Sequence, residues 1–174
     1  MFGLFHVLAA RAKKLVTVDY GTELYIPEGT CAVKDDRPVG RGKQEIQLSD
    51  ILLEEIPAGM SLQAYRASCA GERFWDARML DGLFEKAKSN DSTEWLHTAL
   101  GYNRLVFFLG TTFLTADGEE VVPFLNLSDA LPAFRYVYRI QQPVGGGPGT
   151  GDPLLEVLGL YAPTPYAAVV PQKA

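Results

Sequence analysis

The 174-residue sequence predicts an α+β fold: a mostly antiparallel sheet with two or three helices packed on one face, plus an extended C-terminal arm. Between residues 61 and 100, apolar residues recur at helical spacing. On both sides of this region, short runs alternate apolar and polar residues, as strands with one solvated face do. A Gly/Pro-rich linker at 143–153 separates the predicted domain, 1–142, from the arm, 154–174.

The composition restricts the class of protein. With 47% hydrophobic and 21% charged residues, the chain is too apolar to be disordered. Its net charge of −5 argues against a dedicated nucleic-acid binder, which needs a basic surplus to neutralise phosphates. The acidic excess is concentrated in residues 49–130, and such an acidic middle would suit a basic partner surface. We therefore expect protein partners and no nucleic acid.

The N-terminal residues are expected to form a short amphipathic helix over 2–14. The run Met1–Ala10 is apolar, but its cations follow it, whereas a secretory signal carries them first. The run is also shorter than the roughly 20 residues that cross a bilayer. The sequence thus predicts no secretory signal and no membrane span, which fits an intracellular protein or a virion component.

Four strands are predicted in the first third of the chain: Lys14–Asp19, Glu23–Ile26, Thr30–Val33 and Gln44–Leu48. The charged loop 35–43 lies before the last of them, and this region holds four cations, Lys34, Arg37, Arg41 and Lys43. After these strands, Ser49 and Asp50 can cap a short helix that Pro57 must end, because proline lacks the amide proton of a helix interior.

Three helices are predicted in the middle of the chain. Ser61–Ala70 and Glu72–Ser89 are separated near Gly71, and the second has an apolar face with acids early and lysines late, which complements the helix dipole. The third helix, Thr93–Leu100, ends where Gly101 offers a C-cap.

The sequence after Tyr102 predicts strands. Leu105–Leu109 is continuously apolar, which is typical of a strand covered on both faces. Thr112–Thr115 and Glu120–Leu125 flank an Asp-Gly pair, a strong hairpin signal. A further strand, 134–141, alternates aromatic and polar residues.

The arm is the predicted partner-binding segment. A free apolar arm would be a solubility hazard, so we expect residues 154–170 to bind apolar surface outside the domain's own core, on a neighbouring subunit. The alternative is an arm that folds back on its own sheet. Its candidate contact residues are Leu154, Leu155, Val157, Leu158, Leu160, Tyr161 and Tyr166.

Catalytic chemistry has one candidate pair, Cys69 and His97, on helices that could be adjacent. A cysteine nucleophile needs a base within hydrogen-bond reach and a lowered thiol pKa, and sequence alone shows neither. With two cysteines and two histidines, no metal site is expected. The stretch 146–153 looks like a phosphate loop but has Asp152 and Pro153 where lysine and a hydroxyl residue are needed, so no cofactor is expected.

The leading functional hypothesis is a non-enzymatic structural or assembly protein, a subunit of a larger multi-chain particle held by its terminal arms. A viral or phage virion is one natural setting. Two alternatives remain: a small cysteine-dependent enzyme that uses Cys69 and His97, and an acidic protein inhibitor or adaptor.

Overall fold

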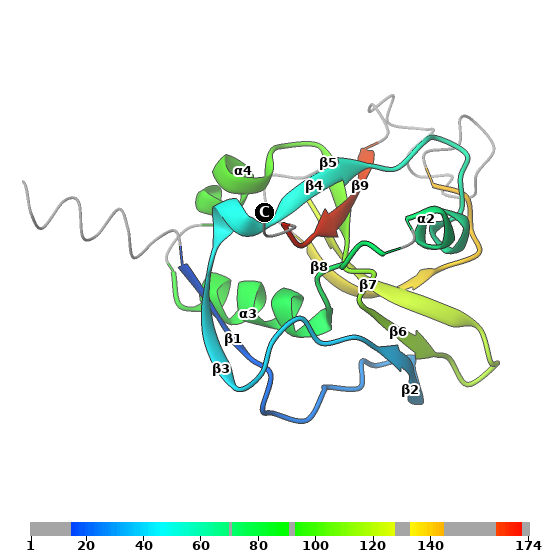
Figure 1. Ribbon diagram of the computed structural model, residues 1–174, viewed down its shortest axis with the longest axis horizontal. Coiled ribbons are helices and arrows are strands. Elements are labelled where there is room, and N and C mark those ends of the chain that lie inside the picture. Colours follow the sequence, from blue (N-terminus) through cyan, green and yellow to red (C-terminus); the bar gives the residue numbers. More distant parts are fainter. Residues whose placement is uncertain (1–14, 70, 91–92, 128–132, 145–162, 172–174) are drawn as a thin grey trace, which may run out of the picture.

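The computed structural model describes residues 15–69, 71–90, 93–127, 133–144 and 163–171 (Figure 1). The strands are β1 Leu15–Asp19, β2 Ala32–Asp36, β3 Lys43–Gln47, β4 Leu52–Glu55, β5 Arg104–Phe107, β6 Thr111–Leu114, β7 Glu120–Asn126, β8 Ala133–Arg139 and β9 Thr164–Val169. The helices are α2 Leu62–Ser68, α3 Ala77–Lys88 and α4 Glu94–Leu100, with a 3₁₀ turn η1 at Leu48–Asp50. The predicted α+β class is confirmed.

Two sheets organise these strands. β1 and β3 form a small antiparallel pair, and the other seven strands form a curled sheet in the order β2-β6-β7-β5-β9-β4, with β8 also paired to β7. Every pairing is antiparallel except that of β5 with β9. β7 pairs with β6 through its first residues and with β5 through its last. The mostly antiparallel character predicted from the sequence is therefore observed.

The β6–β7 hairpin forms where the Asp-Gly pair predicted it. Gly118 has a positive φ of 81°, a conformation that glycine adopts without steric cost. The turn is closed by Thr115, whose backbone N–H donates to the Glu119 carbonyl and whose hydroxyl accepts from the Glu119 N–H.

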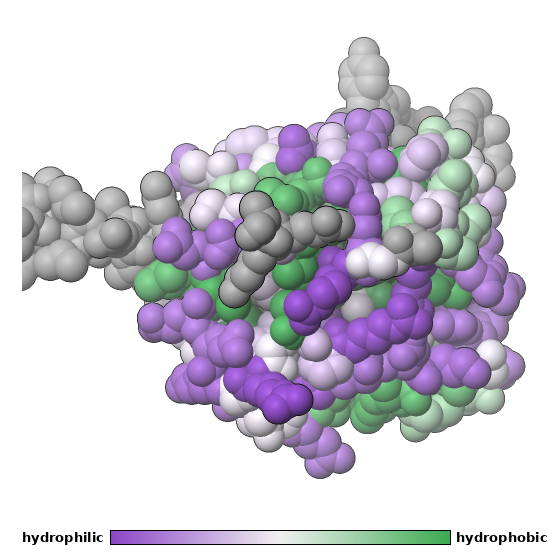
Figure 2. Space-filling model, in the orientation of Figure 1, coloured by the Kyte–Doolittle hydropathy of each residue, from purple (hydrophilic) through white to green (hydrophobic). Residues whose placement is uncertain are grey.

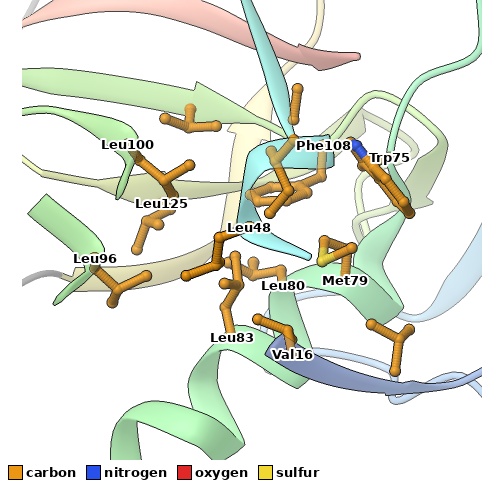
Figure 3. Packing of buried hydrophobic residues seen from close by; sticks show 14 of the residues in the cluster. Val16, Leu48, Trp75, Met79, Leu80, Leu83, Leu96, Leu100, Phe108 and Leu125 are labelled. Carbon is orange, nitrogen blue, oxygen red and sulfur yellow. The ribbon is translucent and has the colours of Figure 1, made fainter. Parts of the chain in front are cut away.

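Both faces of the large sheet are buried at its centre. Along β5, Val106 packs into a cluster with α3, α4 and β1, and the next residue, Phe107, packs into a second cluster with α2. Strand side chains alternate between faces, so α2 lies on the face opposite α3 and α4. Figure 3 shows the first cluster, which includes Val16, Leu48, Trp75, Met79, Leu80, Leu83, Leu96, Leu100, Phe108 and Leu125.

The central helix begins five residues later than the sequence predicted. Asp76 is the N-cap of α3, and its carboxylate accepts the Met79 N–H. The residues before it are extended because they pair with the end of β9: the Trp75 N–H donates to the Ala168 carbonyl at 3.0 Å, and the N–H of Val170, just after β9, donates to the Arg73 carbonyl at 2.8 Å.

Two predicted elements near the N-terminus are wrong. Glu23–Ile26 is not a strand. The short helix expected before Pro57 is replaced by η1 and the strand β4, which pairs with β9 more than 100 residues later in the sequence. The N-terminal helix predicted over 2–14 lies outside the described residues.

The predicted C-terminal arm differs most from the structure. Its segment Thr164–Val169 is β9, which lies between β4 and β5 in the sheet of its own domain. Ala167 and Ala168 are fully buried there. The expectation that residues 154–170 bind outside the domain is therefore wrong for β9, and residues 154–162 lie outside the described part of the chain.

Close backbone packing at Gly110 gives a first prediction. A Cβ at this position would lie 2.7 Å from the Phe74 carbonyl oxygen and 3.0 Å from backbone atoms of Asp76. Neither neighbour can move without disturbing the pairing of residues 73–75, so Gly110→Ala is expected to cost about 1–3 kcal/mol of unfolding free energy. Urea denaturation measures this loss of unfolding free energy. An unchanged denaturation midpoint would show that Gly110 and the segment from Phe74 to Asp76 can move apart without loss of stability.

Candidate interaction surfaces

The predicted partner-binding residues fall into two groups. Tyr166 is half-buried in β9, where the guanidinium carbon of Arg104 lies 4.6 Å from the centre of its ring. It is thus a sheet residue and does not belong to a free arm. The other six, Leu154, Leu155, Val157, Leu158, Leu160 and Tyr161, lie within 145–162, outside the described residues, so their binding role stays a prediction.

Both ends of segment 145–162 are fixed on the domain. Val144 is fully buried, and its N–H donates to the Met60 carbonyl at 3.0 Å. At the other end Pro163 is buried, and the Thr164 N–H donates to the Asn103 carbonyl at 3.0 Å. The apolar segment therefore belongs to an internal connection between two anchored points.

The structure does not bring Cys69 and His97 together. Cys69 ends α2, and its thiol lies 3.9 Å from the hydroxyl of Ser68. His97 is on α4, only 3% exposed, and its ring stacks on that of Tyr102 at a centroid distance of 4.3 Å. Figure 1 places α2 and α4 on opposite sides of the molecule. The base that a thiol nucleophile needs is therefore not supplied by His97.

Apolar side chains are exposed beside the edge strand β2. Val33 on β2 and Tyr25 and Ile26 before it are all exposed. Figure 2 shows apolar side chains at the lower right, where Figure 1 places β2 and β6. Among the described strands, β2 pairs only with β6, so one of its edges is open. Exposed apolar groups next to an open edge are typical of interaction surfaces.

The connection between β2 and β3, residues 37–42, is here named the β2–β3 loop. It runs across the near face of the molecule in Figure 1. At its start, the N–H of Arg37 donates to the Gly110 carbonyl at 2.8 Å. At its end, the carbonyl of Gly42 accepts from the Tyr20 N–H at 2.8 Å. The loop is thus tied to the domain at both ends.

The middle of the loop is held by side chains. The Val39 N–H donates to Oδ2 of Asp76 at 3.2 Å, and the Val39 carbonyl accepts from Nη2 of Arg73 at 2.7 Å. Asp76 therefore has two roles: one carboxylate oxygen holds the loop at Val39, and the other accepts the Met79 N–H and caps α3. This role of Asp76 was not predicted from the sequence, although an aspartate just before a helical run is an N-cap signal.

Ion pairs fix the strand that leads into the loop. Nη1 of Arg78 lies 2.9 and 3.0 Å from the two carboxylate oxygens of Asp36, which also accepts from the Thr111 hydroxyl at 3.1 Å. The neighbouring Asp35 accepts from Arg66 at 2.7 Å and from Arg37 at 2.9 Å.

The pKa values of Asp35 and Asp76 shift in opposite directions. Burial raises the pKa of Asp35, but the hydrogen bonds and charges of Arg66 and Arg37 outweigh it, so this pKa lies below its ordinary value. Burial raises the pKa of the fully buried Asp76 from 3.8 to about 6, although its backbone donors and Arg78 act in the opposite direction. The folded protein thus favours protonated Asp76.

This shift predicts a pH dependence of stability. Because the folded pKa of Asp76 exceeds the unfolded one, its contribution is fully present below pH 3.8 and is lost as pH rises through about 6. The unfolding free energy of the natural chain minus that of Asp76→Asn should fall by about 2 kcal/mol between about pH 4 and pH 7. Urea denaturation at several pH values measures it, and a difference that is constant or rises with pH would contradict the shift.

The described residues contain no group of three or more histidine, cysteine, aspartate or glutamate side chains placed to hold a metal ion. None of the helices in the same ranges has the length and apolar character to cross a membrane. Comparisons of the chain with protein-family models, with curated proteins and with solved structures found no match.

Proposed function

We propose that this protein is a non-enzymatic assembly protein, a subunit of a larger multi-chain particle in which segment 145–162 binds a neighbouring copy. A virion component of a virus or phage is one such setting. The observation that carries the proposal is an apolar sequence placed between two points that are anchored on the domain. The anchors are Val144 and Pro163, both buried.

The segment's composition supports a contact that excludes water. Glu156 is the one charged residue between Leu154 and Tyr161. Each large apolar side chain that becomes fully buried contributes about 1.5–3 kcal/mol before ordering costs. Those costs are lower for a connection fixed at both ends than for a free terminus, because the fixed connection has fewer conformations to lose. The exposed apolar groups beside β2 offer further contact area.

The test replaces residues 145–162 with a Gly/Ser linker of the same length. We expect the variant to keep the unfolding free energy of the natural chain and to lose its self-association in size-exclusion chromatography with light scattering. An internal replacement is required, because a truncation after Val144 would also delete β9.

A matched control replaces only residues 145–153 with a Gly/Ser linker of equal length, so that the apolar half remains. This control should associate like the natural chain. Equal association of all three proteins would overturn the proposal, and so would a loss of association in the control alone.

A further inference from the structure

A second surface on the molecule is cationic. Arg37, Arg41 and Lys43 are exposed in and just after the β2–β3 loop, and the exposed Arg73 lies beside them through its hydrogen bond to Val39. We name these four residues the cationic loop surface. Figure 2 shows hydrophilic side chains on the face across which this loop runs.

Most of this charge is not neutralised locally. Arg37 pairs with Asp35, but within the described ranges no ion pair involves Arg41, Lys43 or Arg73. Lys43 lies opposite Asp19 in the β1–β3 register, and that carboxylate accepts the Gly21 N–H instead. Three cations on one surface are therefore available to an anionic partner.

The β2–β3 loop, which carries Arg37 and Arg41 and leads into Lys43, is fixed at several points although it is exposed. Its backbone is tied at Arg37, Val39 and Gly42, and Gly40 packs so closely on Tyr20 that a Cβ would lie 2.7 Å from a ring carbon. A fixed loop loses little freedom on binding, so this order favours recognition.

The chemistry of the surface indicates carboxylates as its ligand. Guanidinium groups bind carboxylates through directed hydrogen bonds, as Arg78 and Arg66 already do with Asp36 and Asp35 in this chain. A nucleic acid fits less well, because a long polyanion extends beyond these four cations onto a chain of net charge −5, whereas a short acidic segment can stay within the cationic loop surface. We propose that the cationic loop surface binds a carboxylate-rich segment of a partner protein. This surface shares no residue with segment 145–162, so either proposal can fail alone.

The test measures binding of a fluorescent hexaglutamate peptide by fluorescence anisotropy, at low and at physiological salt. The natural chain should bind the peptide, more weakly as salt rises. The double variant Arg41→Glu, Lys43→Glu should bind about tenfold more weakly, because two attractive contacts become repulsive. The matched control Lys88→Glu, Arg139→Glu changes the net charge equally but lies outside the surface, and it should bind within about twofold of the natural chain.

Asp76→Asn tests the role of loop order separately. This variant keeps all four cations and removes a negative charge, so simple electrostatics predicts tighter binding. The proposal predicts weaker binding, because an asparagine oxygen cannot replace both carboxylate oxygens in holding Val39 and Met79. Three results would overturn the proposal. The two charge-reversal variants could weaken peptide binding equally, or the natural chain could fail to bind the peptide. The natural chain could also bind a short DNA duplex more tightly than the peptide, in a way that Arg41→Glu, Lys43→Glu abolishes.

Discussion

Ending the chain after Val144 is expected to abolish cooperative unfolding. The truncation removes β9, which pairs with β4 on one side and with β5 on the other. It also removes the backbone partners of Arg73 and Trp75, which precede α3. Loss of a central strand uncovers both buried clusters, so the truncated chain should not form a stable native state.

Circular dichroism during thermal and urea denaturation measures this loss. A chain ending after Pro171 is the matched control, because it keeps β9 and should unfold cooperatively like the natural protein. A truncated chain with the same cooperative transition as the control would show that β9 is dispensable and that the observed sheet order is wrong.

Leu83→Ala on α3 is expected to cost about 2–5 kcal/mol of unfolding free energy. Leu83 is fully buried in the cluster of Figure 3, and its side chain lies close to Val16 and Leu80. Removing three carbons loses their transfer free energy and leaves a cavity among neighbours from α3, β1 and the sheet.

Urea denaturation of the variant measures the cost. Glu85→Ala, an exposed substitution on the same helix, is the control and should change stability by less than about 0.5 kcal/mol. A loss below about 1 kcal/mol for Leu83→Ala would mean that this face of α3 is not core.

The sequence predicted the elements that depend on local signals. The β6–β7 hairpin follows from the Asp-Gly turn, and α4 ends at Gly101, whose φ is +87°. The apolar stripe of α3 was also predicted, since its periodicity lies within one helix and reports directly which side is buried.

The elements that the sequence misassigned depend on distant partners. β4 and β9 are each short and ambiguous alone, and they become strands because they pair with each other. The extended residues before Asp76 have a helical pattern in sequence, but their backbone groups bond to the end of β9. Pairings of this sequence separation leave no local trace, so single-sequence reasoning cannot find them.

The same distinction applies to the candidate surfaces. The cations Lys34, Arg37, Arg41 and Lys43 were visible in the sequence. The hydrogen bonds that fix the β2–β3 loop come from residues distant in sequence: Tyr20, Arg73, Asp76 and Gly110. The pairing of Cys69 with His97 rested on helices that were close in sequence, and the sheet places those helices on opposite sides.

The central claim, that this chain is an assembly subunit, is tested most directly by sedimentation velocity of the full protein over a wide concentration range. The account predicts species heavier than one chain, whose share grows with concentration and disappears when residues 145–162 are replaced by the linker. A natural chain that sediments as a single monomeric species at every concentration would contradict it.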